Sequence, residues 1–227
     1  MRRGYPLSFV FSVVVATAAF ADPTPVGVLE TILAPDMAEQ KIAGDFSYAG
    51  DPSVCSPQYV NQLMYQTFVN QRGFELLDDL HTDAVGTEPL CGYEFGFYNL
   101  SGGETSAYVT IYDNDAADDA PGKILAGPFT IQGLPSGLVR AFYAAPSGVI
   151  DEDVWMGVKF GQFRGTGLTL ADPVLFGFSH DLAYDPRVGY VNLGPGGLPA
   201  NFVMSVTSHL PVPTSTSTWG FLKARYR

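Results

Sequence analysis

Apolar and polar residues alternate with a period of two along much of the chain after residue 90. Such alternation is typical of strands that bury one face, as in a sheet packed on a second sheet. Gly, Pro and Asp residues separate the alternating segments, which indicates short strands joined by turns. The chain is therefore predicted to be all-β, an antiparallel two-sheet sandwich, jelly-roll-like, over residues 45–210. The positions that carry this prediction are residues 91, 93, 95 and 97, Ala107, Val109 and Ile111, Phe129 and Ile131, Leu138 to Ala144, Val154, Met156, Val158 and Phe160, Val174, Phe176 and Phe178, and Phe202, Met204 and Val206.

Four other segments carry weaker or different signals. Residues 45–48 are predicted to form a short edge strand. Residues 59–68 fit either a short helix, from apolar residues spaced four apart, or a strand, from their β-branched and aromatic content. Residues 99–104 are predicted to form a hairpin turn, and residues 189–199, which are rich in Gly and Pro, a long loop.

Composition agrees with a β-rich domain and with its size. The chain has 16 Phe, 12 Tyr, 25 Gly and 17 Pro, and only 15% of its residues are charged. Aromatic residues favour strands and Gly and Pro favour turns, whereas helices would contain more Ala, Glu and Lys. Without the first 21 of its 227 residues, the chain retains 206, which suits one all-β domain.

Residues 1–21 have the three-part layout of a secretory signal peptide. Two arginines precede an apolar run over residues 7–19, and residues 19–21, Ala-Phe-Ala, form a small-x-small cleavage site. The run is too short to span a bilayer, which takes roughly 20 residues. We therefore expect an exported protein, extracellular or at the cell surface. Its mature chain begins at Asp22, with residues 22–44 as an extension before the sandwich.

The mature chain is strongly acidic. All 23 acidic residues follow residue 21, and of the 12 basic residues two lie in the signal peptide and three in the last five positions. Residues 22–222 thus carry 7 basic against 23 acidic side chains, a formal charge of −16 (7 − 23). This balance argues against nucleic acid and anionic membranes as partners. It is compatible with a cationic partner or calcium, although acidity that simply keeps an exported protein soluble explains it as well.

The two cysteines, Cys55 and Cys91, are predicted to form a disulfide. An even number of cysteines in an exported protein favours pairing. The bond would close a loop of about 36 residues, which the chain-entropy treatment values at roughly 3–4 kcal/mol. Two separate buried thiols remain the alternative. Because no histidine or third cysteine lies near either residue in the sequence, the pair does not resemble a zinc site.

A run of acidic residues after the strand at 107–112 is a candidate calcium site. Its carboxylates belong to Asp113, Asp115, Asp118 and Asp119. Calcium takes six to eight oxygen ligands, which clustered aspartates and backbone carbonyls can supply. The run is not an EF-hand, because Asp and Ile occupy the positions where that loop needs Gly and Glu. The alternative is a polar hairpin connection closed by Pro-Gly at residues 121–122.

Two further acidic clusters, Asp78-Asp79 and residues 151–153, raise the question of catalysis. Paired carboxylates can hydrolyse glycosides when they lie roughly 5–10 Å apart across a cleft. His180 stands between Ser179 and Asp181, but neighbours in sequence do not make a triad, and the chain has no G-x-S-x-G elbow. No catalytic residue is therefore assigned.

Three aromatic residues on predicted strands suggest a different kind of site. Trp155, Tyr108 and Tyr112 would form a sugar-stacking platform if they lay together on an outer sheet face. The alternative for each tyrosine is a half-buried role as a cross-strand partner.

The C-terminal residues 211–227 resemble a shortened PEP-CTERM sorting signal of exported bacterial proteins. Val212-Pro213, a Ser/Thr run, Trp219 and a basic end follow one another in the order of that signal. The Glu of the Pro-Glu-Pro motif is missing and the apolar segment has four residues, so no stable membrane anchor is expected. The alternative is a polar tail without regular structure.

Segments of the core are similar to a β-sandwich domain that occurs in such proteins. The matching segments are residues 94–99, 107–115 and 120–125, and Asp78-Asp79 stands where that family often has an Asp-Asp pair. The resemblance implies a fold and a compartment, not an activity. We therefore expect a secreted or cell-surface non-catalytic protein, binding or structural, with polysaccharide or extracellular matrix as candidate partner. The alternative is a secreted, glycosidase-like hydrolase that uses clustered carboxylates.

Overall fold

The computed structural model describes residues 27–28, 31–33, 40–43, 55–61, 64–69, 71, 73–161, 165–171, 174–192 and 201–209. The predicted signal peptide, the predicted edge strand at 45–48 and the C-terminal tail lie outside these residues. Within them, the only helical turn is the 3-10 turn Ala117–Asp119. No described helix is long and apolar enough to cross a membrane.

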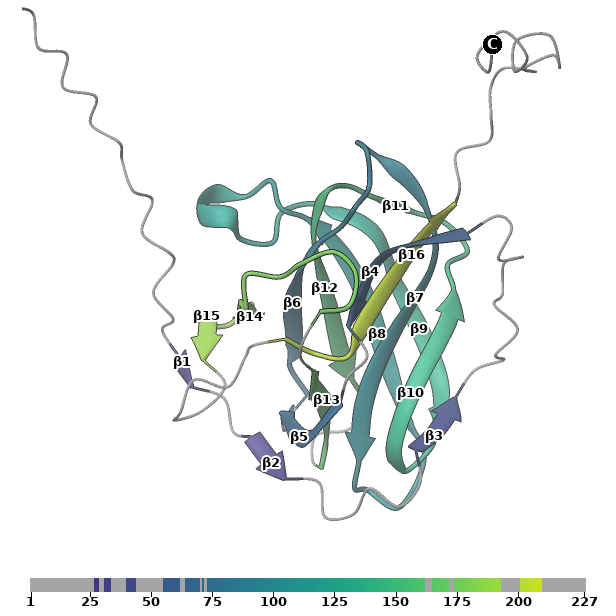
Figure 1. Cartoon of the computed structure of the whole chain (residues 1–227). Helices are drawn as coiled ribbons and strands as arrows, with labels where there is room; N and C mark the ends of the chain where they lie inside the picture. The colour runs from purple at the N-terminus through teal and green to yellow at the C-terminus, as the bar shows by residue number, and fades with distance from the viewer. Residues whose placement is uncertain are drawn as a thin grey trace, which may run out of the picture.

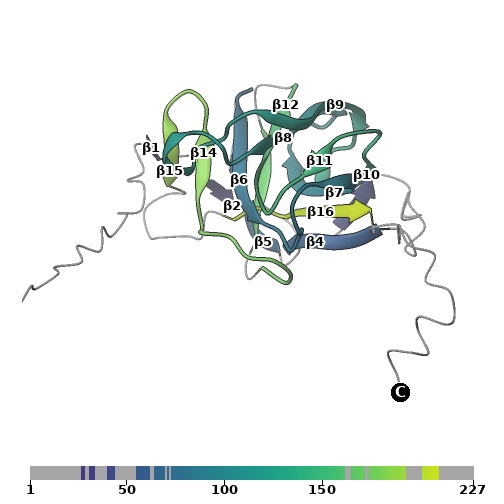
Figure 2. The ribbon, with the colours of Figure 1, turned by 90° about the horizontal axis from the view of Figure 1, so that it is seen from above.

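The described strands form two sheets that pack face to face, as Figure 2 shows from above, so the predicted all-β sandwich is confirmed. The pairs are antiparallel, apart from short parallel contacts of β1 with β15 and of β3 with β10. The first sheet has the order β1 (Gly27–Val28), β15 (Gly189–Asn192), β14 (Ala183–Asp185), β6 (Glu75–His81), β12 (Asp153–Phe160), β8 (Thr105–Asp113), β9 (Ile124–Leu134). The second has the order β2 (Thr31–Leu33), β5 (Met64–Val69), β13 (Thr166–Ala171), β7 (Glu88–Asn99), β10 (Gly137–Ala144), β3 (Gln40–Ala43). In addition β16 (Met204–His209) pairs with β7 and with β4 (Cys55–Asn61), and β11 (Val149–Ile150) pairs with β7 (Figure 1).

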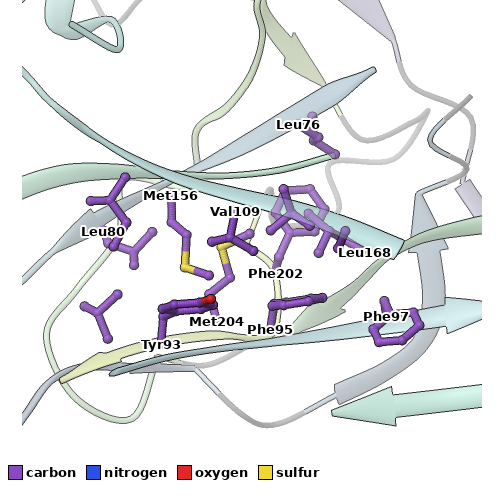
Figure 3. Packing of buried hydrophobic residues seen from close by; sticks show 14 of the residues in the cluster. Leu76, Leu80, Tyr93, Phe95, Phe97, Val109, Met156, Leu168, Phe202 and Met204 are labelled. Atoms are coloured by element: carbon purple, nitrogen blue, oxygen red, sulfur yellow. The ribbon is translucent and has the colours of Figure 1, made fainter. Parts of the chain in front are cut away.

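The core lies between the sheets and consists of the residues that the alternation places on one face. Val109 of β8 and Met156 of β12 face Tyr93 and Phe95 of β7 across the interior (Figure 3). The rings of Phe95 and Phe160 lie 6.2 Å apart in the same cluster. The period-two prediction is thus confirmed for residues 93, 95 and 97 of β7 and for β8, β12 and β16, whose inward residues are almost completely buried, whereas Cys91 is not part of the core cluster.

The predicted hairpin turn at residues 99–104 is wrong. It joins β7 of the second sheet to β8 of the first, so it is an arch between sheets. The side chain of Asn99 stabilises the arch, because its amide donates to the carbonyls of Gly103 (2.8 Å) and Pro135 (3.3 Å). Its oxygen accepts from the backbone N–H of Ser101 at 3.0 Å. A hairpin and an arch use similar turn residues, so only the packing of the two sheets decides which of them forms.

Two segments differ from the alternation in an informative way. The described part of residues 59–68 follows the strand alternative, but in two strands, since β4 ends at residue 61 and β5 begins at residue 64. The predicted strand at residues 174–178 is absent. Gly177 has a φ of 75° there, and a Cβ would lie 2.5 Å from the carbonyl oxygen of His81. This left-handed residue breaks the alternation, and Phe176 and Phe178 are partly exposed instead of buried.

Candidate functional site

The two aspartates of β6 point to opposite faces of the first sheet. Leu76 and Leu80 belong to the core cluster, so Asp78, two residues from each, also points inward. Asp79 lies directly opposite Trp155 of β12 and shares its outer face. The pair therefore cannot act together across one cleft, as two carboxylates of a glycosidase must.

Asp78 connects the two sheets from inside the sandwich. It is fully buried, and its Oδ2 accepts a hydrogen bond from the backbone N–H of Phe202 at 3.0 Å. Its Oδ1 has no hydrogen-bond partner among the described residues. Burial raises the pKa of Asp78 well above its usual value, and the nearby charges of Asp79 and Asp181 raise it further. Burial also raises the pKa of the neighbouring Tyr59 phenol.

Asp79 holds the loop at residues 179–182, which lies beside β6 between the bridge of Phe178 with His81 and the start of β14. Its carboxylate accepts hydrogen bonds from Ser179 Oγ (2.7 Å), from the N–H of His180 (2.6 Å) and from the N–H of Leu182 (2.9 Å). Burial raises the pKa of Asp79, although these hydrogen bonds oppose the shift. Asp181, inside the same loop, has a φ of 59°, a left-handed conformation that aspartate tolerates better than most residues.

The fold brings serine, histidine and aspartate together, but in the wrong order for a triad. Ser179 Oγ donates to Asp79, and His180 Nδ1 lies 3.5 Å from the other oxygen of the same carboxylate. A nucleophilic serine needs the imidazole between itself and the acid, because the imidazole takes the hydroxyl proton. Here the acid lies between the other two. This arrangement orients a loop and does not activate a nucleophile.

The third acidic cluster meets His81 at the end of β6. The imidazole Nδ1 is hydrogen-bonded to Asp153 Oδ1, and its Nε2 lies 3.9 Å from Glu152 Oε1. The ring of Phe178 lies 3.9 Å from that of His81 and 5.0 Å, edge-on, from that of His180. Phe178 is 43% exposed. We call His81, Phe178 and His180 the ring stack. It is an outward aromatic surface with two carboxylates beside it.

The predicted calcium loop is closed by a lysine. Lys123 Nζ lies 2.6 Å from Asp113 Oδ2 and 3.4 Å from Asp115 Oδ2. The backbone N–H of Lys123 also donates to Asp115 Oδ1 at 3.0 Å, and this bond is the main reason that the pKa of Asp115 is lowered. Asp119 contributes its backbone carbonyl to Trp155 Nε1, and the side chain of Asp118 lies outside the described atoms. β8 and β9 pair on either side, so the hairpin connection is confirmed, and calcium binding there stays a prediction.

The expected platform of Trp155, Tyr108 and Tyr112 is wrong in its main residue. Trp155 is only 2% exposed, because the rings of Tyr184 and Tyr190 pack on it at 5.9 and 6.1 Å. Tyr112 bonds through its hydroxyl to Glu75. Tyr108 alone of the three is exposed. Sequence reasoning missed the ring stack, because Phe178 reads as one more inward position of an alternating strand.

Cys55 and Cys91 form the predicted disulfide. One ligand atom of His209 lies within 4.8 Å of both sulfur atoms, and this is the only group of three or more His, Cys, Asp or Glu ligands found among the described residues. No histidine is close to the cysteines in the sequence, but the fold brings His209 next to both of them. The signal that sequence reasoning lacked is the pairing of β4 with β16, which are separated by most of the chain.

No family model, curated protein or solved structure matches this chain. Three groups of side chains are the candidates for a functional role. They are the buried Asp78, the loop held by Asp79 with its ring stack, and the disulfide with His209.

Proposed function

We propose that the chain is an exported, non-catalytic β-sandwich protein that binds polysaccharide at the ring stack. The observation that carries the non-catalytic part is the use of Asp79. Its carboxylate accepts three hydrogen bonds from the loop at 179–182, and it separates Ser179 from His180. In this arrangement the carboxylate fixes the position of the loop and has no imidazole between itself and Ser179 with which to activate the serine hydroxyl. Export rests on residues 1–21 and on the resemblance of the tail to a PEP-CTERM signal.

The chemistry of the ring stack supports polysaccharide as the ligand class. Sugar rings present an apolar C–H face that packs on aromatic rings, and hydroxyl groups that donate to carboxylates. Phe178 offers the exposed ring, and the exposed carboxylates of Glu152 and Asp153 lie beside it through their contacts with His81. The acidic composition favours neutral or cationic glycans over anionic ones.

A binding and activity screen tests the proposal. The mature protein would be run through gels that contain single soluble polysaccharides, where binding retards migration, and assayed in parallel on chromogenic glycosides. We expect retardation by at least one neutral polysaccharide and no turnover. The alternative hydrolase would show turnover that disappears in Asp79→Asn or Asp78→Asn, and that result would overturn the non-catalytic assignment.

A further inference from the structure

The disulfide lies at an end of the second sheet where three strands run side by side. β4, β16 and β7 are adjacent there (Figure 1), and each contributes one side chain that can bind a metal. These are Cys55, His209 and Cys91. Their ligand atoms all lie within 4.8 Å of one another. Ligands about 2.0–2.3 Å from one zinc ion lie roughly 3–4 Å apart, so small side-chain movements would bring all three ligand atoms to one ion.

The strand register explains why these three side chains meet. Cys55 is the direct partner of His209 in the β4–β16 ladder, so the two side chains leave the sheet on the same face. On the other side of β16, Thr207 pairs with Gly92 and Ser208 with Leu90, so Cys91 is the extra residue of a bulge. A bulge re-aims the side chain at its position, here toward the other two ligands. The backbone pairing continues along β16 to Met204. It therefore keeps the three side chains close to one another even when the disulfide is reduced.

We propose that reduction of the Cys55–Cys91 disulfide creates a metal site for a zinc-like divalent ion, with His209 as the third ligand. A dithiol reductant supplies two electrons and two protons and is itself oxidised to a disulfide, which leaves two thiols in the chain. Metal binding then releases both thiol protons to solvent, because thiolates are the ligands. Two thiolates and one imidazole leave the fourth tetrahedral position for water.

The exposure of the ligands suits an ion that enters from solvent. His209 is exposed and Cys55 is partly exposed, whereas Cys91 is 5% exposed. The inner thiolate is thus shielded while the outer ligands remain accessible. The excess of acidic residues over the whole chain, −11 in formal charge, also attracts cations. The site is redox-gated, because the oxidised chain has no thiolate to offer. This inference does not depend on the proposed binding of polysaccharide.

Cobalt(II) is the probe that tests the site, because its thiolate complexes absorb strongly by sulfur-to-metal charge transfer. The full mature chain would be reduced with a dithiol, freed of reductant under nitrogen and titrated with cobalt(II). We expect one ion per chain with a charge-transfer band, displaced by zinc, and no band in the oxidised chain. Mutation of residues that only hydrogen-bond to a metal ligand already weakens metal affinity about 10–100-fold. Because His209 is itself a ligand, we expect His209→Gln to lower the affinity for cobalt at least about tenfold.

His180→Gln is the matched control, since it makes the same change at an exposed imidazole elsewhere and should bind cobalt like the parent. An absent band in the reduced parent, or equal affinity in His209→Gln and the parent, would overturn the proposal. Far-UV circular dichroism covers the case in which reduction unfolds the chain. Recovery of the β spectrum when metal is added supports the site, because the ion then binds only the folded state. A chain that stays unfolded in stoichiometric metal contradicts it.

Discussion

Asp78 Oδ2 accepts a hydrogen bond from the backbone N–H of Phe202 at 3.0 Å, across 124 residues of sequence. Asp78 belongs to β6 of the first sheet, and Phe202 stands just before β16 of the second. The bond therefore crosses the interior of the sandwich. It satisfies a buried N–H, but it also keeps a carboxyl group away from water, with one oxygen lacking a partner among the described residues.

Asp78 should make the protein less stable as pH rises from about 4. An aspartate titrates near 3.9 in the unfolded chain, and the pKa of Asp78 in the folded state is raised. Below both pKa values the carboxyl is protonated in both states. As pH rises, the unfolded state ionises first, and unfolding becomes easier by up to about 1.4 kcal/mol per pH unit until the folded pKa is reached.

The measurement is urea denaturation of the parent and of Asp78→Asn between pH 4 and pH 8. Asparagine can still accept from the Phe202 N–H and does not ionise, so the variant should gain stability relative to the parent as pH rises. Asp83→Asn, at an exposed aspartate, is the control and should follow the parent. If the free energy of unfolding changes with pH in the same way for Asp78→Asn and for the parent, ionisation of Asp78 does not destabilise the folded state.

Asp79→Ala should loosen the loop at residues 179–182. The change removes the acceptor for Ser179 Oγ and for two backbone N–H groups. We expect a loss of about 2–4 kcal/mol in the free energy of unfolding, because hydrogen bonds to a charged acceptor contribute about 1.5–3 kcal/mol each and water satisfies part of the loop. Asp79→Asn keeps one carbonyl oxygen and should lose less. Hydrogen exchange of the loop amides measures the effect directly, and unchanged protection in Asp79→Ala would contradict it.

Calcium, if it binds the loop at residues 113–123, must compete with a lysine. Lys123 Nζ already lies against the carboxylates of Asp113 and Asp115. We therefore predict that Lys123→Met binds calcium more tightly than the parent. A hundredfold excess of calcium over Kd would add about 2.7 kcal/mol of stability. Melting of both chains with calcium and with chelator tests this, and Asp115→Ala in the Lys123→Met background should abolish the shift. No shift in Lys123→Met would leave the loop as a plain hairpin.

Trp155 should stabilise the loop at residues 113–123 through two hydrogen bonds from its indole. Its Nε1–H donates to Asn114 Oδ1 at 2.9 Å and to the Asp119 carbonyl at 3.0 Å. Trp155→Phe keeps a buried ring and removes this donor, so we expect a loss of about 1–3 kcal/mol in the free energy of unfolding, from the two unsatisfied acceptors and the smaller ring. Chemical denaturation measures it. Tyr108→Phe, which changes an exposed ring on the neighbouring strand, should be neutral.

Local pattern was sufficient for the core and insufficient for the sites. Val109 and Met156 could be assigned to the interior because alternation depends only on neighbours in the chain. Phe178 could not, because Gly177 has a positive φ and packs closely against the backbone of His81, and both features interrupt the alternation. The contacts of Asp79 with Ser179 and of Cys55 with His209 depend on long-range pairing of strands, which composition and spacing do not determine.

The affinity of Phe178→Ala for a retarding polysaccharide tests whether the ring stack binds glycans. The measurement is the dissociation constant from gel retardation for the parent, for Phe178→Ala and for Tyr108→Ala, which removes an exposed ring from β8. Loss of one stacking ring should weaken binding about tenfold, whereas Tyr108→Ala should bind like the parent. Equal dissociation constants for the parent and Phe178→Ala, or no binding to any polysaccharide in the panel, would contradict a glycan-binding role for the ring stack.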